Sequence, residues 1–149
     1  MALVNINGLK RYYEMASGTV KALDGINLKI EEGERILLLG PSGSGKTTLL
    51  NCLAALDNPT DGDYDFNGQT VPKKHAEKMT TFRRDNIGYV FQFFNLLQDL
   101  TVLENILLIQ ELSDGRDEAR ARQLLSLVGL VDEMNRFPAE ISGGQQQRV

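Results

Sequence analysis

A glycine-rich octapeptide constrains the fold of this chain more than any other stretch. Residues 40–47 read GPSGSGKT and match the phosphate-loop pattern G-x-x-x-x-G-K-[ST] at every fixed position. A continuously apolar run, residues 36–39, comes directly before the loop, and leucines at helical spacing follow it over residues 46–56. Such an apolar run is typical of a strand buried on both faces. The order of strand, glycine loop and helix predicts an α/β fold with a phosphate site at the loop.

The residue types in this loop suit a nucleoside triphosphate. Glycines let backbone N–H groups approach the phosphates, and the following helix adds the positive end of its dipole. We expect Lys46 to bind the β- and γ-phosphates and Thr47 to ligate Mg²⁺ through its hydroxyl. The alternative, a glycine-rich turn with an incidental lysine, is disfavoured by the flanking strand and helix patterns. The expected nucleotide-binding residues of the loop are Gly40, Pro41, Ser42, Gly43, Ser44, Gly45, Lys46, Thr47 and Thr48.

Composition limits the other classes of function. The chain has 149 residues, enough for one domain with a core, and a net charge of -4, which gives no general attraction to nucleic acid or anionic lipid. Cys52 is the only cysteine, so an internal disulfide is excluded and we expect a small buried filler in the helix after the loop. The lone His75, the lysine pair at 73–74 and the arginine pair at 83–84 are expected on the surface. Neither a signal peptide nor an apolar run of membrane-spanning length is evident, so a membrane role would need a partner.

Outside the loop the sequence predicts both strands and helices. Strands are expected at residues 3–6, 22–30, 35–39 and 87–91, the last two as buried strands. Residues 63–71 predict a hairpin that turns at Asn67-Gly68, a strong turn dipeptide. Helical periodicity runs over residues 102–131, with Gly129 at the expected C-terminal cap.

A second glycine motif follows about a hundred residues after the loop, as Ser142-Gly143-Gly144-Gln145. A serine cap and two glycine N–H groups at a helix N-terminus would make a second anion site. One ATP cannot easily use two helix N-termini from distant parts of one small domain, whereas two chains facing head to tail can. A plain linker before a polar helix is the alternative, and the phosphate loop in the same chain disfavours it. The motif pair therefore predicts ATP held between the loop of one subunit and the second motif of another.

With these motifs, and with RRDNIGYVFQ at residues 83–92 and LTVLEN at residues 100–105, the whole chain resembles the first two-thirds of an ATP-binding cassette (ABC) transporter ATPase. It is most similar to the lipoprotein-release and macrolide-export group. The resemblance implies a P-loop NTPase core with an N-terminal antiparallel β subdomain, over about residues 1–92, and a helical subdomain ending in the signature motif, over about 93–149. By the same resemblance the C-terminal part of the core is missing.

The resemblance also implies a function and partners. The chain would be an ATP-binding subunit that uses ATP and Mg²⁺ and couples hydrolysis to export or lipoprotein release. Its partners would be a second ATPase subunit and an integral-membrane permease, without nucleic acid, at the cytoplasmic face of the membrane. The alternatives are a soluble ABC ATPase that acts on DNA or ribosomes, and a nucleotide-binding regulator that never hydrolyses. Residues 48–141 contain neither a heptad tract nor a second phosphate loop, which disfavours the DNA and ribosome types.

Roles for further residues follow from the resemblance. Gln92 would position Mg²⁺ and the attacking water. The aromatic ring that stacks on adenine precedes the loop, where Tyr12 and Tyr13 are both candidates, and counting back from Ala22-Leu23 favours Tyr13. The family's catalytic Asp-Glu strand and switch histidine come after the signature motif and are not in this sequence, and the acidic pair at 132–133 is no substitute. We therefore expect the chain to bind ATP without hydrolysing it.

Overall fold

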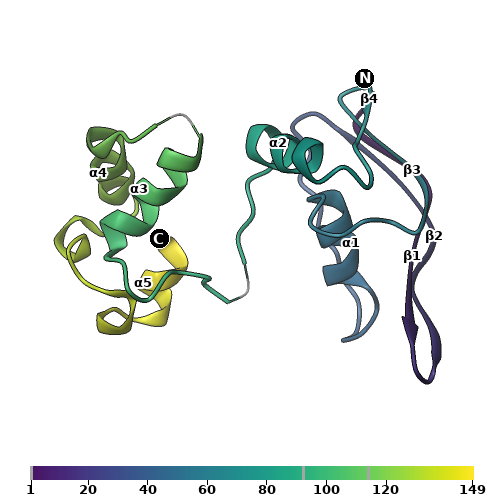
Figure 1. Cartoon of the computed structure of the whole chain (residues 1–149), viewed down its shortest axis with the longest axis horizontal. Helices are drawn as coiled ribbons and strands as arrows, with labels where there is room; N and C mark the ends of the chain where they lie inside the picture. The colour runs from purple at the N-terminus through teal and green to yellow at the C-terminus, as the bar shows by residue number, and fades with distance from the viewer. Residues whose placement is uncertain (1, 92, 114) are drawn as a thin grey trace. The chain divides into compact units, whose positions relative to one another are not determined.

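A computed structural model describes residues 2–91, 93–113 and 115–149, which form two compact units. The first unit runs to Tyr89 and the second is Val90–Val149. The first combines a sheet with two helices, and the second is helical (Figure 1). Within the described part of the chain, no helix is long and apolar enough to cross a membrane.

The sheet of the first unit has four antiparallel strands in the order β2-β1-β3-β4. Strands β1 (Ala2–Met15) and β2 (Gly18–Glu31) form one long hairpin that runs along the side of this unit (Figure 1). The strands predicted at 3–6 and 22–30 are confirmed, and both are longer than predicted. Strands β3 (Asp61–Phe66) and β4 (Gln69–Thr70) flank the predicted turn. Asn67 and Gly68 both have positive φ, 48° and 74°, as a type I′ hairpin requires.

Two helices, α1 (Lys46–Leu53) and α2 (Ala76–Asn86), bury their apolar residues against one face of this sheet. Cys52 is 2% exposed, which confirms the buried filler, and burial raises the pKa of its thiol to about 11. His75 is exposed, as predicted. The core residues are Val4, Ile6, Leu9, Leu23, Leu49, Cys52, Ala55, Tyr64, Val71 and Met79.

The two basic pairs depart from the prediction of a fully solvated surface. Lys73 is partly buried and its ammonium donates a hydrogen bond to the carbonyl of Gly62. Arg83, also partly buried, donates to the carbonyl of Ala55 at 2.8 Å. One cation of each pair therefore donates to a backbone carbonyl of the first unit, a contact that composition alone does not reveal.

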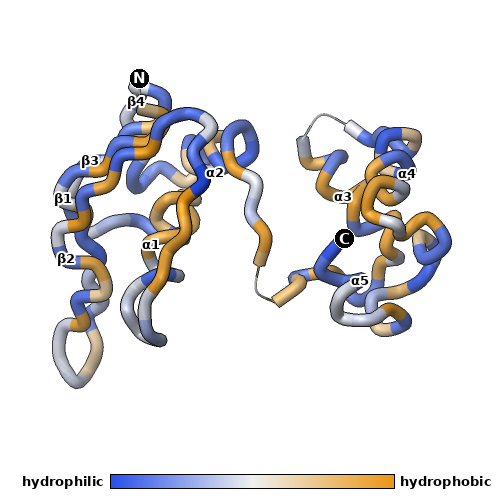
Figure 2. The backbone as a smooth tube through the Cα atoms, turned by 180° about the vertical axis from the view of Figure 1, so that it is seen from behind, coloured by the Kyte–Doolittle hydropathy of each residue, from blue (hydrophilic) through white to orange (hydrophobic). Residues whose placement is uncertain are grey.

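The two predicted buried strands are wrong as strands. Residues 35–39 and 87–91 have no regular secondary structure, although the first of them is the apolar stretch that leads into α1 (Figure 2). Leu37 is 78% exposed, Leu39 82% and Val90 79%, and only Leu38 of the first run packs against the core. A strand needs a hydrogen-bonded neighbour, and none of the four described strands pairs with either segment. Their apolar composition thus indicates that these segments need burial, but it does not show which strand would pair with them.

The second unit is built from α3 (Val102–Ser113), α4 (Glu118–Leu127) and α5 (Gly143–Arg148), with 3₁₀ turns at Val131–Glu133 and Pro138–Glu140. The helical stretch predicted over 102–131 is therefore two helices. Gly115 has φ of 100°, and Asp117 caps α4 by accepting from the N–H of Arg120 at 2.9 Å. Gly129, with φ of 69°, follows the end of α4 as predicted. The core of this unit consists of Val102, Leu103, Leu107, Ala121, Leu125, Leu130 and Ile141.

One buried amide fixes the segment before α3. Asn105 is 8% exposed and its Oδ1 accepts from the N–H of Leu97 at 2.8 Å. Its Nδ2 donates to the carbonyls of Leu97, Leu100 and Thr101 at 3.0–3.1 Å. The amide thus bonds backbone groups in a turn that has no regular secondary structure. Without it, these polar groups would have no hydrogen-bond partner when buried.

Candidate functional site

The predicted phosphate loop has the conformation that its glycines suggest. Gly45 is the N-cap of α1 with φ of 90°, and Gly43 has φ of 79°. Both angles lie in the left-handed region that glycine adopts without strain. A Cβ at Gly45 would lie 2.5 Å from the carbonyl oxygen of Ala22, so the loop is held directly against β2. The sheet therefore sets where the first turn of α1 begins.

Lys46 supplies a positive charge at this loop. Its Nζ donates to the carbonyls of Gly40 at 2.8 Å and Pro41 at 2.7 Å, and lies 3.4 Å from Ser44 Oγ. Thr47 is exposed at the first turn of α1, and Thr48 is partly buried. An ammonium and the N-terminus of a helix thus meet at one loop, and both attract anions. Residues 41–44 are exposed to solvent.

Tyr13, the residue expected to stack on adenine, is fixed in the same unit. Its hydroxyl donates to Asp57 Oδ2 at 2.7 Å, and the guanidinium carbon of Arg11 lies 4.3 Å from its ring centroid. Asp57 lies in the segment between α1, which ends at Leu53, and β3, and it also accepts from Arg11 Nε at 2.9 Å. Asp57 and Arg11 were missed by sequence reasoning, because their contacts join residues 44 and 46 positions apart.

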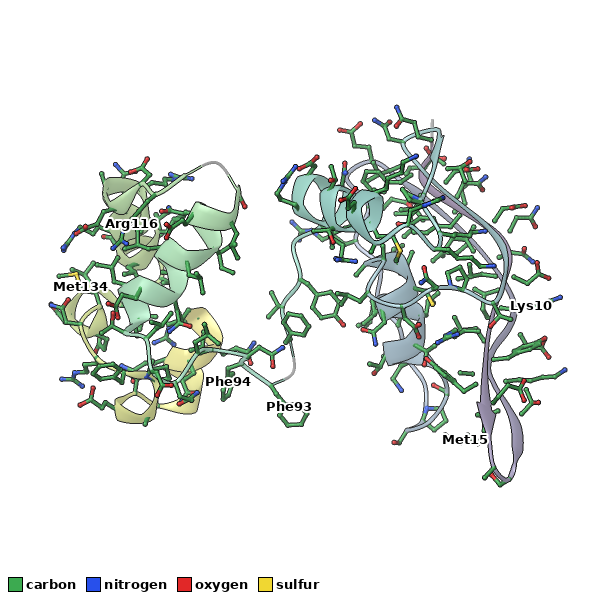
Figure 3. All side chains as sticks on the ribbon, in the orientation of Figure 1. Lys10, Met15, Phe93, Phe94, Arg116 and Met134 are labelled. Carbon is green, nitrogen blue, oxygen red and sulfur yellow. The ribbon has the colours of Figure 1, made fainter. Side chains whose placement is uncertain are left out.

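Tyr12 lies in a different environment. Its hydroxyl donates to Asp24, and the ammonium of Lys21 lies 5.2 Å from its ring centroid. Successive side chains of a strand point to opposite faces, so Tyr12 shares a face with Lys10. Lys10 points away from α1 (Figure 3). Of the two tyrosines, Tyr13 is therefore the one on the face that carries α1.

The second predicted motif begins α5 in the helical unit. Ser142 is confirmed as the N-cap: its Oγ accepts from the N–H of Gln145 at 3.3 Å, and the N–H of Ser142 donates to Gln145 Oε1 at 2.8 Å. This reciprocal pair is a capping box. Gly143 and Gly144 are exposed. Gln145 Nε2 also donates to Glu133 Oε1 at 3.1 Å, so one member of the acidic pair is engaged with the motif.

Phe91 and Phe94 contact the same helix. The side chain of Gln147 donates to the carbonyl of Phe91 at 3.3 Å. A Cβ at Gly143 would lie 3.5 Å from the ring of Phe94, so the glycine fits against that ring. Gln92, the residue predicted to position Mg²⁺ and water, lies outside the described residues. No sequence pattern predicts the contact of Phe94 with Gly143.

The donor set of the loop fits a nucleoside triphosphate and its magnesium ion. Gly45 lets the loop lie against β2, Lys46 supplies a cation, and Thr47 supplies an exposed hydroxyl. Mg²⁺ is commonly held by one or two protein oxygens together with phosphate oxygens and water. In the part of the chain that the structure describes, no cluster of three His, Cys, Asp or Glu side chains offers a separate metal site. A metal carried by the nucleotide and ligated by Thr47 suits this chemistry.

Comparison with known sequences identifies the family. A family profile described as ABC transporter matches residues 23–149. An uncharacterised ABC transporter ATP-binding protein of Mycobacterium tuberculosis is 46% identical over 150 residues, which cover 99% of this chain and 60% of the relative. The macrolide export ATP-binding/permease protein MacB of Bdellovibrio bacteriovorus is 40% identical over 148 residues, which cover 99% of this chain and 23% of the relative.

Solved structures agree with this result. The ATP-binding cassette MJ0796, in a dimeric structure of a post-hydrolysis state bound to ADP and Pi, is 38% identical with a TM-score of 0.89. The match covers 97% of this chain and 66% of that one. The chain thus spans about 60% of the mycobacterial relative and 66% of the cassette. The predicted α/β fold of the P-loop ABC ATPase type is confirmed. The chain therefore belongs to the ABC transporter family, as an ATP-binding domain.

Proposed function

We propose that this chain binds Mg-ATP for an ABC exporter or lipoprotein-release system. Lys46 and the N–H groups of residues 43–48 bind the β- and γ-phosphates, Thr47 ligates the metal, and Tyr13 stacks on adenine. The observation that carries this proposal is the ammonium of Lys46 over the loop carbonyls at the start of α1. This cation at the N-terminus of α1 supports a phosphate site at the loop.

The signature motif belongs to the same proposal. Ser142, Gly143, Gly144 and Gln145 contact ATP bound to the loop of a second subunit, in a head-to-tail dimer. The solved cassette MJ0796 is described as dimeric and bound to ADP and Pi, which supports this arrangement by relationship. The exposed backbone of Gly143 and Gly144 leaves these two residues accessible to such a partner.

The direction of transport and the membrane partner are inferred from the relatives. One relative is a macrolide export ATP-binding/permease protein, which supports export and a permease partner for this chain. We place the chain at the cytoplasmic face of the membrane, attached through that permease. Bound Mg²⁺ would neutralise charge on the phosphate oxygens, and Gln92 would position the attacking water.

We also propose that the 149-residue chain binds ATP without turning it over. Hydrolysis needs a carboxylate that can accept a proton from the attacking water. Glu133, an acidic residue in contact with the signature motif, lies in a 3₁₀ turn and accepts a hydrogen bond from Gln145. It is therefore engaged within its own unit.

Calorimetric titration of Mg-ATP into the chain tests the binding site. Lys46→Ala should weaken ATP binding by about tenfold to a hundredfold, since a hydrogen bond to a charged group contributes roughly 1.5–3 kcal/mol. Lys78→Ala, which removes an exposed lysine from α2, is the matched control and should bind ATP like the unaltered chain. Equal affinities for Lys46→Ala and the control, with unchanged circular dichroism, would rule out the assignment.

A further inference from the structure

We propose that Arg11 and Asp57 are positioning residues that hold Tyr13 as one wall of the base site, with a single ring face open to the purine. This inference rests on the proposed function, because it assumes that a nucleotide occupies the loop. It assigns roles to two residues outside the phosphate loop, the signature motif and the tyrosine itself.

Three side chains form a closed set of contacts. Arg11 meets Asp57 through two separate bonds, Nε to Oδ2 at 2.9 Å and Nη2 to Oδ1 at 2.8 Å. Tyr13 donates to the same Oδ2 at 2.7 Å, while the guanidinium carbon lies 4.3 Å from its ring centroid. A guanidinium at this distance covers the ring face on its own side. The ring is therefore restrained at its hydroxyl and on one face.

The restraint is stronger than that of an ordinary surface ion pair. The side chains of Arg11 and Asp57 are only 24% and 23% exposed, and their two-bond geometry is fixed in both distance and direction. Burial by itself would raise the pKa of the Asp57 carboxyl. The hydrogen bonds from Tyr13 and Arg11 outweigh it and hold that pKa below its ordinary value. Asp57 therefore stays charged at neutral pH and keeps both partners.

The position of the set relative to the loop suits a base site. Gly45 of the loop lies against Ala22 of β2. Tyr13 on β1 pairs with Val20, which lies two residues before Ala22 on β2. Two residues along a strand and one strand across amount to roughly 8 Å. This separation matches the span from the β-phosphate to the base of an extended nucleotide.

The contacts of Tyr13 and Arg11 also predict how the base would be recognised. The Tyr13 hydroxyl is already donated to Asp57, and the guanidinium of Arg11 faces the ring and the carboxylate. Neither group is then available to the edge of the base. Recognition would depend on stacking, which every purine provides, so discrimination between ATP and GTP should be weak.

Paired titrations with Mg-ATP and tripolyphosphate, a ligand without a base, test the inference. Asp57→Asn should weaken ATP binding by about threefold to tenfold, part of the full worth of a base–aromatic stack. It should leave tripolyphosphate binding unchanged. Asp61→Asn is the matched control, because it removes the exposed partner of Lys10 on β1, and it should alter neither affinity.

A double-mutant cycle shows whether the pair acts through the tyrosine. In a Tyr13→Ala background, Asp57→Asn should produce no further loss of ATP affinity, since the ring that it positions is gone. Quenching of an etheno-adenine ATP analogue should fall in Asp57→Asn and recover in part in Asp57→Glu.

The outcomes separate this inference from the proposed function. Equal losses for ATP and tripolyphosphate in Asp57→Asn, or no loss for either, would overturn the positioning role, and Lys46-dependent tripolyphosphate binding would still support the phosphate site. An additive effect in the Tyr13→Ala background would overturn it as well. If the unaltered chain bound neither ligand, the proposed function would fail and this inference with it.

Discussion

Replacement of Gly45 by alanine should destabilise the first unit far more than the same change at Gly43. Both glycines have left-handed φ, 90° and 79°, which costs alanine about 1–2 kcal/mol at either site. A Cβ at Gly45 would also lie 2.5 Å from the carbonyl oxygen of Ala22 and 3.3 Å from Leu23 Cδ2, whereas a Cβ at Gly43 meets nothing within 4 Å. Overpacking of this kind adds about 1–3 kcal/mol. We therefore expect losses of roughly 1–2 kcal/mol for Gly43→Ala and roughly 2–5 kcal/mol for Gly45→Ala.

Urea unfolding followed by tyrosine fluorescence measures this difference. The chain has no tryptophan, and its 4 tyrosines all lie in the unit that carries the loop. The signal therefore reports on the relevant unit, and the free energy of unfolding follows from the midpoint and slope. Equal losses for the two variants would refute the close approach of the loop to β2.

Three further outcomes are expected. Asn105→Ala should destabilise the second unit by about 2–4 kcal/mol, because it removes several buried hydrogen bonds that contribute roughly 0.5–1.5 kcal/mol each. Hydrogen exchange of α3 peptides measures this, with Gln98→Ala, an exposed amide, as a control that should change little. Because Leu37 and Leu39 are 78% and 82% exposed, we expect the chain to self-associate in sedimentation velocity, and Leu37→Glu with Leu39→Glu should reduce this association without lowering stability. The Asp57 carboxyl has a lowered pKa in the folded chain, so its stabilising contribution is complete above about pH 4 and is lost at lower pH. The stability difference between Asp57→Asn and the unaltered chain, measured by thermal melts, should shrink accordingly.

Features set by neighbouring residues were predictable from the sequence. The glycine spacing predicted the loop before α1, because only glycine adopts the φ values at Gly43 and Gly45 without strain. The serine and glutamine spacing likewise predicted the cap at Ser142, where both hydrogen bonds join residues three apart. Such contacts need no knowledge of the rest of the fold.

Features that depend on distant partners were not predictable. The apolar run at 36–39 indicates a need for burial, but the neighbour that would provide it cannot be read from the run itself. The contact of Tyr13 with Asp57 joins residues 44 positions apart, and no sequence pattern near either residue predicts it. Asn105 did leave a weak signal, as an amide beside the apolar residues in the first half of α3. Its carbonyl partners lie in irregular chain, which periodicity does not describe.

The hydrogen bonds of Lys46 have a consequence for which anions the loop accepts. Fixing a lysine side chain costs up to about 2 kcal/mol of rotamer freedom. The hydrogen bonds of Lys46 to the carbonyls of Gly40 and Pro41 already offset this cost in the folded chain. The oxygens of a ligand must therefore replace these two peptide carbonyls as hydrogen-bond partners of the ammonium, which is not free to move. A phosphate oxygen with full negative charge wins that exchange, because it attracts the ammonium as an opposite charge, whereas a peptide carbonyl offers only a dipole. A weakly charged oxyanion does not, so the loop sets a threshold of charge that a ligand must exceed before Lys46 turns toward it.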